Sequence, residues 1–431
     1  MGTLSEHRFT LGTRMRLARA RLPPAYGVEV RVLRRSGRDL ALLALGLALL
    51  AAALVPILLG RPRLLEPIDL VVYRTAGRAA LHGWSLYAPS FLAHSGGHLP
   101  FTYPPFAAIV LVPLAILPLG ADYVLWSAMC LVALWALVRL SFGRLLARCP
   151  ARFRVLVVLG LTAAAALTVP VAEHLTLGQV GIPLTLLCVA DVLPARTRWP
   201  RGLLVGVATA IKLTPGLFVA YFLLTRQWRA AATSAATTAA AWLVAAAVMP
   251  AGSWRYFVGG VGFDPSRAGA VTEVANQSLW GTTHRWWGSA GELPWLCLAL
   301  AVLVVGLHRA RLAERSGNRL AAASLVGVTS LLVSPVSWMH TAAWLVPALA
   351  ALVGDGRRLR RAVAALAVWV VLLLLVPHPA PSVATGLDGW YVKFVLHESL
   401  VYVYLAILFL LPVGDQRRAR IRYPSMVTAR V

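Results

Sequence analysis

The sequence is short of acidic residues. Among 431 residues, 16 are Asp or Glu and 41 are Lys or Arg, which gives a formal net charge of +25. Charged residues make up only 13% of the chain, whereas a soluble domain carries about 25%. This shortage excludes an ordinary soluble globular domain. Lysine is almost missing too, with only Lys212 and Lys393, so the positive charge is nearly all arginine.

Cysteine is also scarce. The four cysteines, Cys130, Cys149, Cys188 and Cys297, are far apart in the chain. Their spacing matches neither a disulfide framework nor a zinc site. We therefore expect ordinary packing thiols.

The sequence is rich in apolar residues. Hydrophobic residues make up 59% of the chain, the mean hydropathy is +0.73, and apolar runs near the length of a bilayer crossing recur from Asp39 to Leu411. These runs do not alternate, so a β-barrel is excluded. We predict an all-α polytopic membrane protein with about 12 apolar helical segments, at about 39–60, 103–118, 121–141, 154–170, 178–194, 202–225, 229–249, 291–308, 320–336, 338–354, 361–377 and 395–412.

The arginine clusters set the expected orientation. They fall at 14–38, 139–154, 196–201, 226–229, 308–319, 357–361 and 417–422, and positively charged loops favour the cytoplasmic side. Scattered over short loops, they indicate contact with anionic lipid and no nucleic-acid partner. We predict a basic cytoplasmic arm at 1–38, a transmembrane catalytic domain at 39–412 and a basic cytoplasmic tail at 413–431.

The remaining connections then face outward. Two places break the parity of crossings, so either some short segments re-enter the membrane without crossing it or the charge rule fails locally. The segment 202–225 is interrupted by "IKLTP", which predicts a broken helix there. Non-helical backbone at membrane depth requires burial in protein or a wet cavity.

The outward loop 61–102 contains two acids, Glu66 and Asp69. With roughly 40 residues the loop is too long for a mere connection, and "TAGRAALHG" predicts a short helix that ends at Gly83. Asp69 could be a solvated acid paired with Arg74 or Arg78. It could equally act as a general base for a sugar hydroxyl. Tyr73, one helical turn further on, becomes a candidate neighbour in a cavity.

An isolated charge lies inside an apolar segment. Lys212 has roughly ten apolar-segment residues on each side, and an ammonium at membrane depth is costly unless it faces a cavity or a partner. Pro215 would open the helix beside it. We expect Lys212 to hold a phosphate or a carboxylate.

Other polar motifs are expected on the same outward face. They include Tyr103 in "FTYPPF", Gln179 in "LTLGQ", Asn276 in "NQSLWGTTHR" and His340 in "SPVSWMH". A histidine at a helix end is often structural, but it can also serve as an acid, a base or a donor to phosphate. Together these residues predict a basic, amide-rich cavity that suits an anionic lipid-linked donor and a polyhydroxyl acceptor.

The order of these motifs resembles a known family. The stretches "IDLVVY…AALHGWSLY…LPFTYPPFAAIVLVPLAILP", "GQ", "IKLTPGLF", "NQSLWG…R" and "SPVSWMH" closely resemble glycosyltransferase family 87, a group of actinobacterial membrane mannosyltransferases with the GT-C fold. The resemblance implies transfer of mannose from polyprenyl-phosphate-mannose on the outer (periplasmic) side of the plasma membrane. It implies a mannosylated glycolipid acceptor, of the phosphatidylinositol mannoside, lipomannan or lipoarabinomannan type. It also implies an α-1,2 linkage formed with inversion.

The resemblance also implies roles for single residues. Asp69 corresponds to the general base, and His340 to the histidine near the reacting groups or the donor phosphate. The basic positions Lys212 and Arg285 are expected to face that phosphate. The residues expected to shape the cavity are Tyr103, Gln179, Asn276 and Gln277. Because no second acid forms an evident metal site with Asp69, we predict transfer without a metal or other cofactor.

Two alternatives stay open from sequence. One is an arabinofuranosyltransferase of the same fold that uses decaprenyl-phosphate-arabinose. The other is a glycolipid transporter or flippase, but transporters often contain internal repeats, and none is evident in this sequence. Transport would also leave the acid of the outer loop without a role.

Overall fold

A computed structural model describes residues 67–88, 91, 99–374 and 395–414. The chain divides into two compact units, Met1–Ala41 and Leu42–Val431, and every described residue belongs to the second. The predicted arm 1–38, the first apolar segment at 39–60 and the tail after 414 lie outside the described residues. The proposed domain boundaries therefore remain predictions.

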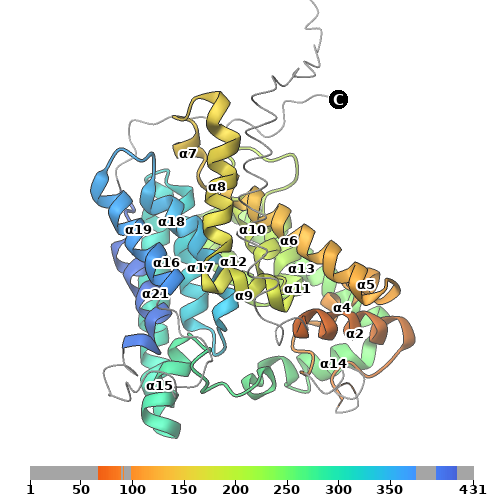
Figure 1. Ribbon diagram of the computed structural model, residues 1–431. Helices are drawn as coiled ribbons and strands as arrows, with labels where there is room; N and C mark the ends of the chain where they lie inside the picture. The colour runs from red at the N-terminus through yellow and green to blue at the C-terminus, as the bar shows by residue number, and fades with distance from the viewer. Residues whose placement is uncertain (1–66, 89–90, 92–98, 375–394, 415–431) are drawn as a thin grey trace, which may run out of the picture. The chain divides into compact units, whose positions relative to one another are not determined.

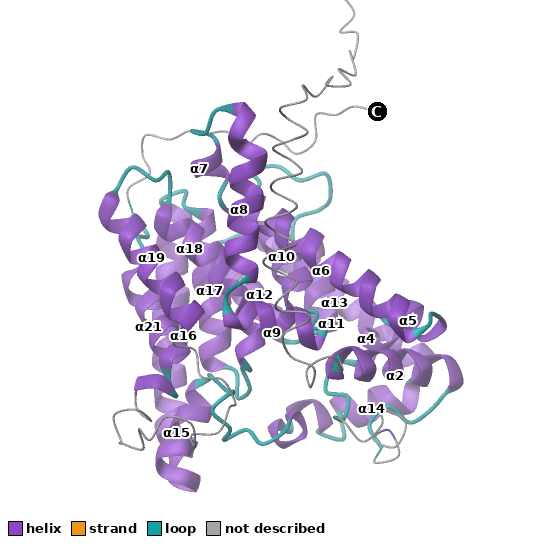
Figure 2. Cartoon of the chain, in the orientation of Figure 1, coloured by secondary structure: helices purple, strands orange, loops and turns teal. Residues whose placement is uncertain are grey.

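The described chain consists of helices and loops (Figure 2), and its only β-type contact is an isolated bridge between Asn276 and Trp338. The first helices are α2 (Ile68–His82), α4 (Pro105–Val110), α5 (Val112–Ile116), α6 (Leu119–Ser141), α7 (Gly143–Leu146), α8 (Arg154–Ala166), α9 (Val169–Leu177) and α10 (Gly181–Val192). They are followed by α11 (Leu203–Ile211), α12 (Leu217–Leu224), α13 (Trp228–Val248), α14 (Pro250–Phe257), α15 (Leu279–Trp287), α16 (Glu292–Arg315), α17 (Arg319–Val333), α18 (Leu345–Val353), α19 (Leu359–Leu374) and α21 (Ser399–Leu410). Short 3-10 turns are η2 (Ala151–Phe153), η3 (Thr214–Gly216), η4 (Val261–Phe263), η5 (Pro265–Ala268), η6 (Gly288–Gly291) and η7 (Met339–Trp344). The all-α prediction is confirmed for the described residues.

Several helices are long and apolar enough to cross a membrane. Among the described residues there are three, Gly120–Ser141, Trp228–Val248 and Leu279–Arg315. A fourth crossing is possible if the bent pair α8 and α9, which meet at 81°, forms one span. Five further apolar helices have only 10–17 residues. The helical membrane class is confirmed, and the number of about twelve segments remains a prediction.

The predicted break at "IKLTP" is present. Helix α11 ends at Lys212, whose backbone is extended, with φ −144° and ψ 133°. The turn η3 and then α12 follow. Pro215 has no N–H to continue a helical ladder. The break therefore places the Lys212 side chain at a helix end, which is where a cavity can reach it.

Helix α17 forms the centre of the helical core (Figure 1). Every residue from Leu320 to Leu332 is buried, as expected for a helix that is apolar all round. The helix contacts α16, α18, α21, α10 and α12. Small residues permit this close packing: a Cβ added at Gly327 would lie 2.0 Å from the Trp344 ring.

Helix α2 packs against α4 and α5 through a glycine. Its buried face includes Leu70, Tyr73 and Ala76, at helical spacing. A Cβ at Gly77 would lie 2.5 Å from the carbonyl oxygen of Leu111, a backbone atom that cannot move aside as a side chain can. The position of α2 therefore depends on glycine at 77.

We expect Gly77→Ala to destabilise the protein by about 1–3 kcal/mol, because the added methyl group overpacks this contact. Thermal unfolding of the purified protein in detergent, followed by tryptophan fluorescence, measures the change. Gly160→Ala is the matched control: that glycine is also helical and has nothing within 4 Å of an added Cβ. The control should be neutral or slightly stabilising. An unchanged Tm for Gly77→Ala would contradict the packing described.

Candidate active site

Helix α2 positions Asp69 and Tyr73. It begins after Pro67, so Asp69 lies in the first turn, where the helix dipole favours a carboxylate. It ends as the sequence predicted, at Gly83, which adopts a left-handed conformation with φ 68° and donates its N–H to the Ala79 carbonyl. Tyr73 is fully buried, whereas Asp69 is half-buried. The acid therefore keeps access to its surroundings beside a fixed phenol.

A second glycine brings Gln179 to this helix. Helix α9 ends at Gly178, whose φ is 75°. A Cβ at Gly178 would lie 2.8 Å from Cβ of Leu70, the residue after Asp69. Gln179 follows in the turn between α9 and α10. Glycine at 178 thus allows the turn that carries Gln179 to reach the start of α2.

The side chain of Gln179 joins the predicted site residues. Its Oε1 accepts hydrogen bonds from the Tyr73 hydroxyl at 3.0 Å and from the Tyr103 hydroxyl at 3.3 Å. The two hydroxyl oxygens lie 2.9 Å apart. With its oxygen occupied, the amide donates to Asp69 through its nitrogen, and this hydrogen bond stabilises the carboxylate.

Lys212 lies beside Tyr103. Its Nζ is 3.5 Å from the Tyr103 hydroxyl and 5.1 Å from the centroid of that ring. Its charge acts on Asp69 and also on His340. The structure therefore brings together Asp69, Tyr73, Tyr103, Gln179 and Lys212, with His340 within electrostatic range of the ammonium.

The environment changes the acidity of Asp69. Burial, the largest effect, raises the pKa of Asp69 from its ordinary 3.8 to about 6. The hydrogen bond from Gln179 and the charge of Lys212 oppose that rise. A carboxylate with a pKa near 6 is a better proton acceptor than an ordinary aspartate and is still mostly ionised at pH 7.

Lys212 also lines a pocket with hydroxyl groups. Leu184, Pro215, Leu331 and Val336 form an apolar part of the wall, and the other lining residues are Thr185, Thr214, Ser337, Thr341, Gly181 and Trp344. These come from α10, from the broken segment after α11 and from the segment that carries His340. An ammonium among neutral hydroxyls, with no carboxylate in the lining, forms a site suited to an anion.

Arg74, one of the two possible partners for Asp69, is engaged elsewhere. Its Nη1 donates to Oδ2 of Asp122, which is fully buried in α6. The charge of Arg78 also acts on Asp122. The interpretation of Asp69 as the ion-pair partner of Arg74 is therefore wrong, and the cation that acts on Asp69 is Lys212.

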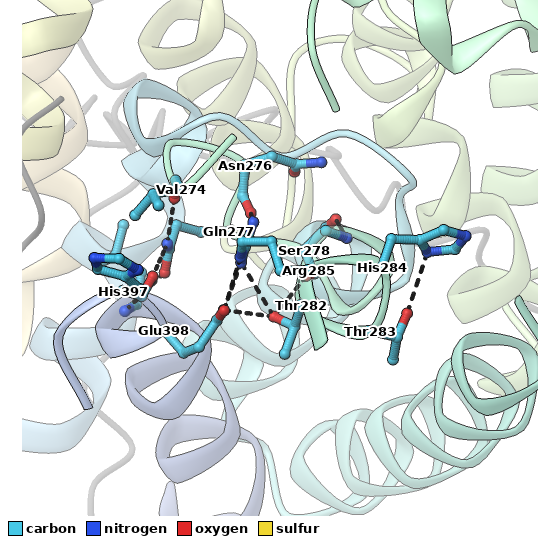
Figure 3. A network of polar contacts seen from close by, with 12 residues as sticks. Val274, Asn276, Gln277, Ser278, Thr282, Thr283, His284, Arg285, His397 and Glu398 are labelled. Carbon is cyan, nitrogen blue, oxygen red and sulfur yellow. Dashed lines mark hydrogen bonds and ion pairs between the residues drawn. The ribbon is translucent and has the colours of Figure 1, made fainter. Parts of the chain in front are cut away.

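The predicted amides at 276 and 277 hold loops together. Asn276 is fully buried, donates to the carbonyls of Val271 and Pro335, and accepts the Ser337 N–H at 2.8 Å. Gln277, also fully buried, accepts the Leu400 N–H at 3.1 Å and donates to the carbonyls of Val274 and His397 (Figure 3). Neither side chain lines the Lys212 pocket. Asn276 instead fixes Ser337, which does.

Arg285 belongs to the same network. Its Nε donates to Oε1 of Glu398 at 2.8 Å, and its Nη2 lies 2.5 Å from Oε2 (Figure 3). The remaining hydrogen bonds go to the Thr282 hydroxyl and to the carbonyls of Glu273 and Asn276. A guanidinium has five N–H donors, so this set occupies all of them. The structure places Arg285 in a loop-holding ion pair rather than beside Lys212.

Sequence reasoning did not identify Glu398 or His174, the histidine of α9 that contacts His340. Glu398 is almost fully buried, and its partners Arg285 and Thr282 are more than 110 positions away in sequence. No local motif signals such a contact. Among the described residues, no group of three or more His, Cys, Asp or Glu side chains is placed to hold a metal ion.

Two comparisons with known proteins agree with one another, and both find glycosyltransferases. The model of glycosyltransferase family 87 matches residues 101–335. A Mycobacterium tuberculosis protein named polyprenol-phosphate-mannose-dependent alpha-(1-2)-phosphatidylinositol mannoside mannosyltransferase is 35% identical over 295 residues, which are 65% of this chain and 69% of that protein. A Mycolicibacterium smegmatis protein of the same name is 36% identical over 341 residues, 72% of this chain and 77% of that protein. No solved structure matches.

A second Mycolicibacterium smegmatis relative is named as a phosphatidylinositol pentamannoside mannosyltransferase. It is 36% identical over 284 residues, which are 65% of this chain and 68% of that protein. With the helical bundle and its polar site, these matches define a membrane glycosyltransferase. The chain belongs to glycosyltransferase family 87, which confirms the resemblance seen in the sequence. Asp69 and His340 lie outside residues 101–335, the span that the family model matches.

The acidity of Asp69 predicts a pH dependence. If the carboxylate must be ionised to accept a proton, kcat/KM for sugar transfer should fall as the pH drops through about 6 and should be retained above it. Lys212→Met removes a charge that lowers this pKa, so the acid limb should move to higher pH. Arg255→Met, at an exposed arginine bonded to Ser85, is a control that should leave the limb in place. An acid limb near pH 4 would contradict the environment described.

The ion pair predicts a loss of stability. Glu398→Ala leaves the Arg285 charge buried without its partner, and we expect a cost of about 3–5 kcal/mol. Glu314→Ala removes a less buried partner, that of Arg319, and should cost less. Thermal unfolding of both variants measures the difference. Equal or smaller loss at 398 would contradict the role of the network.

Proposed function

We propose that this protein transfers mannose from polyprenyl-phosphate-mannose to a mannosylated glycolipid of the phosphatidylinositol mannoside type. The proposed linkage is α-1,2 and forms with inversion at the anomeric carbon. Three observations support the proposal: the names of the relatives, the half-buried acid, and the pocket lined by Lys212 and by hydroxyl side chains. The carrying observation is the pairing of Asp69, with a pKa near 6, and Lys212, whose charge acts on Asp69 and whose ammonium lies 3.5 Å from the Tyr103 hydroxyl.

In the proposed reaction Asp69 acts as the general base. An acceptor hydroxyl bound beside Asp69 gives its proton to the carboxylate as its oxygen attacks the anomeric carbon of the donor. The bond between that carbon and the phosphate oxygen breaks, and the polyprenyl phosphate leaves with the electron pair. Gln179 holds Asp69 in place through its amide nitrogen, because its oxygen is occupied by Tyr73 and Tyr103.

The leaving phosphate needs positive charge rather than a proton. We assign this role to Lys212 and the hydroxyls of the pocket that it lines. His340 lies in the segment that closes this pocket, and we propose that it contacts the reacting groups or the phosphate. Tyr73 and Tyr103 shape the sugar-binding wall, and Asn276, Gln277 and Arg285 hold the loops behind it.

The membrane arrangement is part of the proposal. We propose a GT-C fold of about twelve apolar segments, with the active site on the outer face of the plasma membrane. The arginine-rich loops support this orientation, because positively charged loops favour the cytoplasmic side. No step of the proposed reaction requires a metal, because the base and the phosphate-binding cation are both protein side chains.

The test is mannosyl transfer by the purified protein. Asp69→Asn keeps the shape of the side chain and removes the proton acceptor, so transfer of labelled mannose should fall by at least about 1,000-fold, while donor binding is retained. Assays with and without a chelator, and with decaprenyl-phosphate-arabinose as a competing donor, test metal dependence and donor identity.

Asp264→Asn is the matched control. Asp264 is exposed in a loop and accepts from Ser266, so its variant should transfer mannose at the wild-type rate. A folded Asp69→Asn protein that transfers mannose normally would overturn Asp69 as the base. Wild-type protein that uses only the arabinose donor, or moves lipid without forming a glycosidic bond, would overturn the proposed function itself.

A further inference from the structure

One buried histidine lies between the segment that carries His340 and the start of α10. His174 lies in α9 and is 1% exposed. Its Nδ1 is 3.3 Å from the backbone carbonyl of His340, and its Nε2 accepts the N–H of Ile182 at 3.3 Å. The ring therefore bridges the segment that carries His340 and the first turn of α10.

These two contacts define one form of the ring. A backbone carbonyl only accepts, so Nδ1 must carry the proton, and Nε2 must then be unprotonated to accept the Ile182 N–H. A cationic ring could not make both bonds. The ring also fits closely, since a Cβ at Gly181 would lie 3.3 Å from its Cε1. The position is built for a neutral imidazole.

The backbone of His174 contacts the turn that carries Gln179. Its carbonyl accepts the N–H of Gly178 and the N–H of Gln179, the latter at 3.0 Å. Gln179 in turn binds Asp69 through its amide. One residue thus fixes the turn that holds Asp69 and, through its ring, the backbone of His340.

We propose that His174 is a positioning residue that sets the separation between the base, Asp69, and His340. The proposal rests on the proposed transferase function, and it names a residue that touches neither the donor nor the acceptor. Without the ring, the 339–344 segment loses a contact to α9, and the α9–α10 turn that carries Gln179 loses the hydrogen bond from the Ile182 N–H across it. A displacement of about 1 Å at a reacting group can cost roughly 100-fold in rate.

The proposal predicts a specific set of changes in His174→Leu. kcat for mannose transfer should fall by roughly 10- to 100-fold while KM for the donor changes little. The acid limb of the pH profile should also move to higher pH, because displaced Gln179 no longer lowers the pKa of Asp69. The groups that face Asp69 are Gln179, Lys212 and Tyr73, and of these Gln179 is hydrogen-bonded to His174.

Two further variants separate positioning from mere stability. Leu175→Ala is the matched control, since Leu175 is a buried neighbour in the same helix and its truncation costs about 2–5 kcal/mol. It should lower Tm and leave kcat and the acid limb unchanged. His174→Asn keeps a donor near the Nδ1 position, so it should recover part of the lost kcat.

The outcomes decide the proposal. A lower kcat and a shifted acid limb in His174→Leu, with partial rescue by His174→Asn, support it. If His174→Leu does not fold, the comparison of His174→Asn with His174→Gln decides, since only Asn presents a donor where Nδ1 lies. Equal kcat in those two variants, or a His174→Leu protein that behaves like Leu175→Ala, overturns the positioning role. Wild-type protein that transfers no mannose instead overturns the proposed function.

Discussion

The Gln179 amide offers one acceptor oxygen and one donor nitrogen, and the site depends on how the protein uses them. Two tyrosine hydroxyls occupy the oxygen, so the nitrogen is directed to Asp69. Burial alone raises the pKa of the carboxyl group and would leave it protonated, unable to accept a proton. The amide and the nearby Lys212 limit that rise and keep the pKa near 6. The site therefore acts as one unit, in which the Asp69 acid depends on the amide, the two phenols and the ammonium.

Backbone features deliver these side chains to one place. Glycines at 77 and 178 let α2 approach its neighbours where any Cβ would clash. The break after α11 turns Lys212 out of a helical ladder, and the bend between α8 and α9 carries Gln179 and His174 toward α10. None of these features takes part in the proposed reaction. Each fixes the distance between groups that come from distant parts of the chain.

The sequence predicted the local features well and the long-range ones poorly. Gly83 as a helix end and the break at Lys212 follow from residue types that act within a few positions, and both are confirmed. The sequence led us to expect Asn276 and Gln277 in the cavity wall, whereas both side chains bind loop backbone. An amide side chain gives the same sequence signal whether it binds sugar or backbone. His174 and Glu398 gave no signal, since the contacts of His174 with His340 and of Glu398 with Arg285 span more than 100 positions.

The central claim is that Asp69 is an aspartate adapted to accept a proton. Infrared difference spectroscopy of the purified protein, titrated from pH 4 to pH 8 and compared with Asp69→Asn, observes the carboxyl group directly. The account predicts one carboxyl group that ionises near pH 6 and is absent from the variant spectrum. An Asp69 that ionises near its ordinary value of 3.8 would contradict the account.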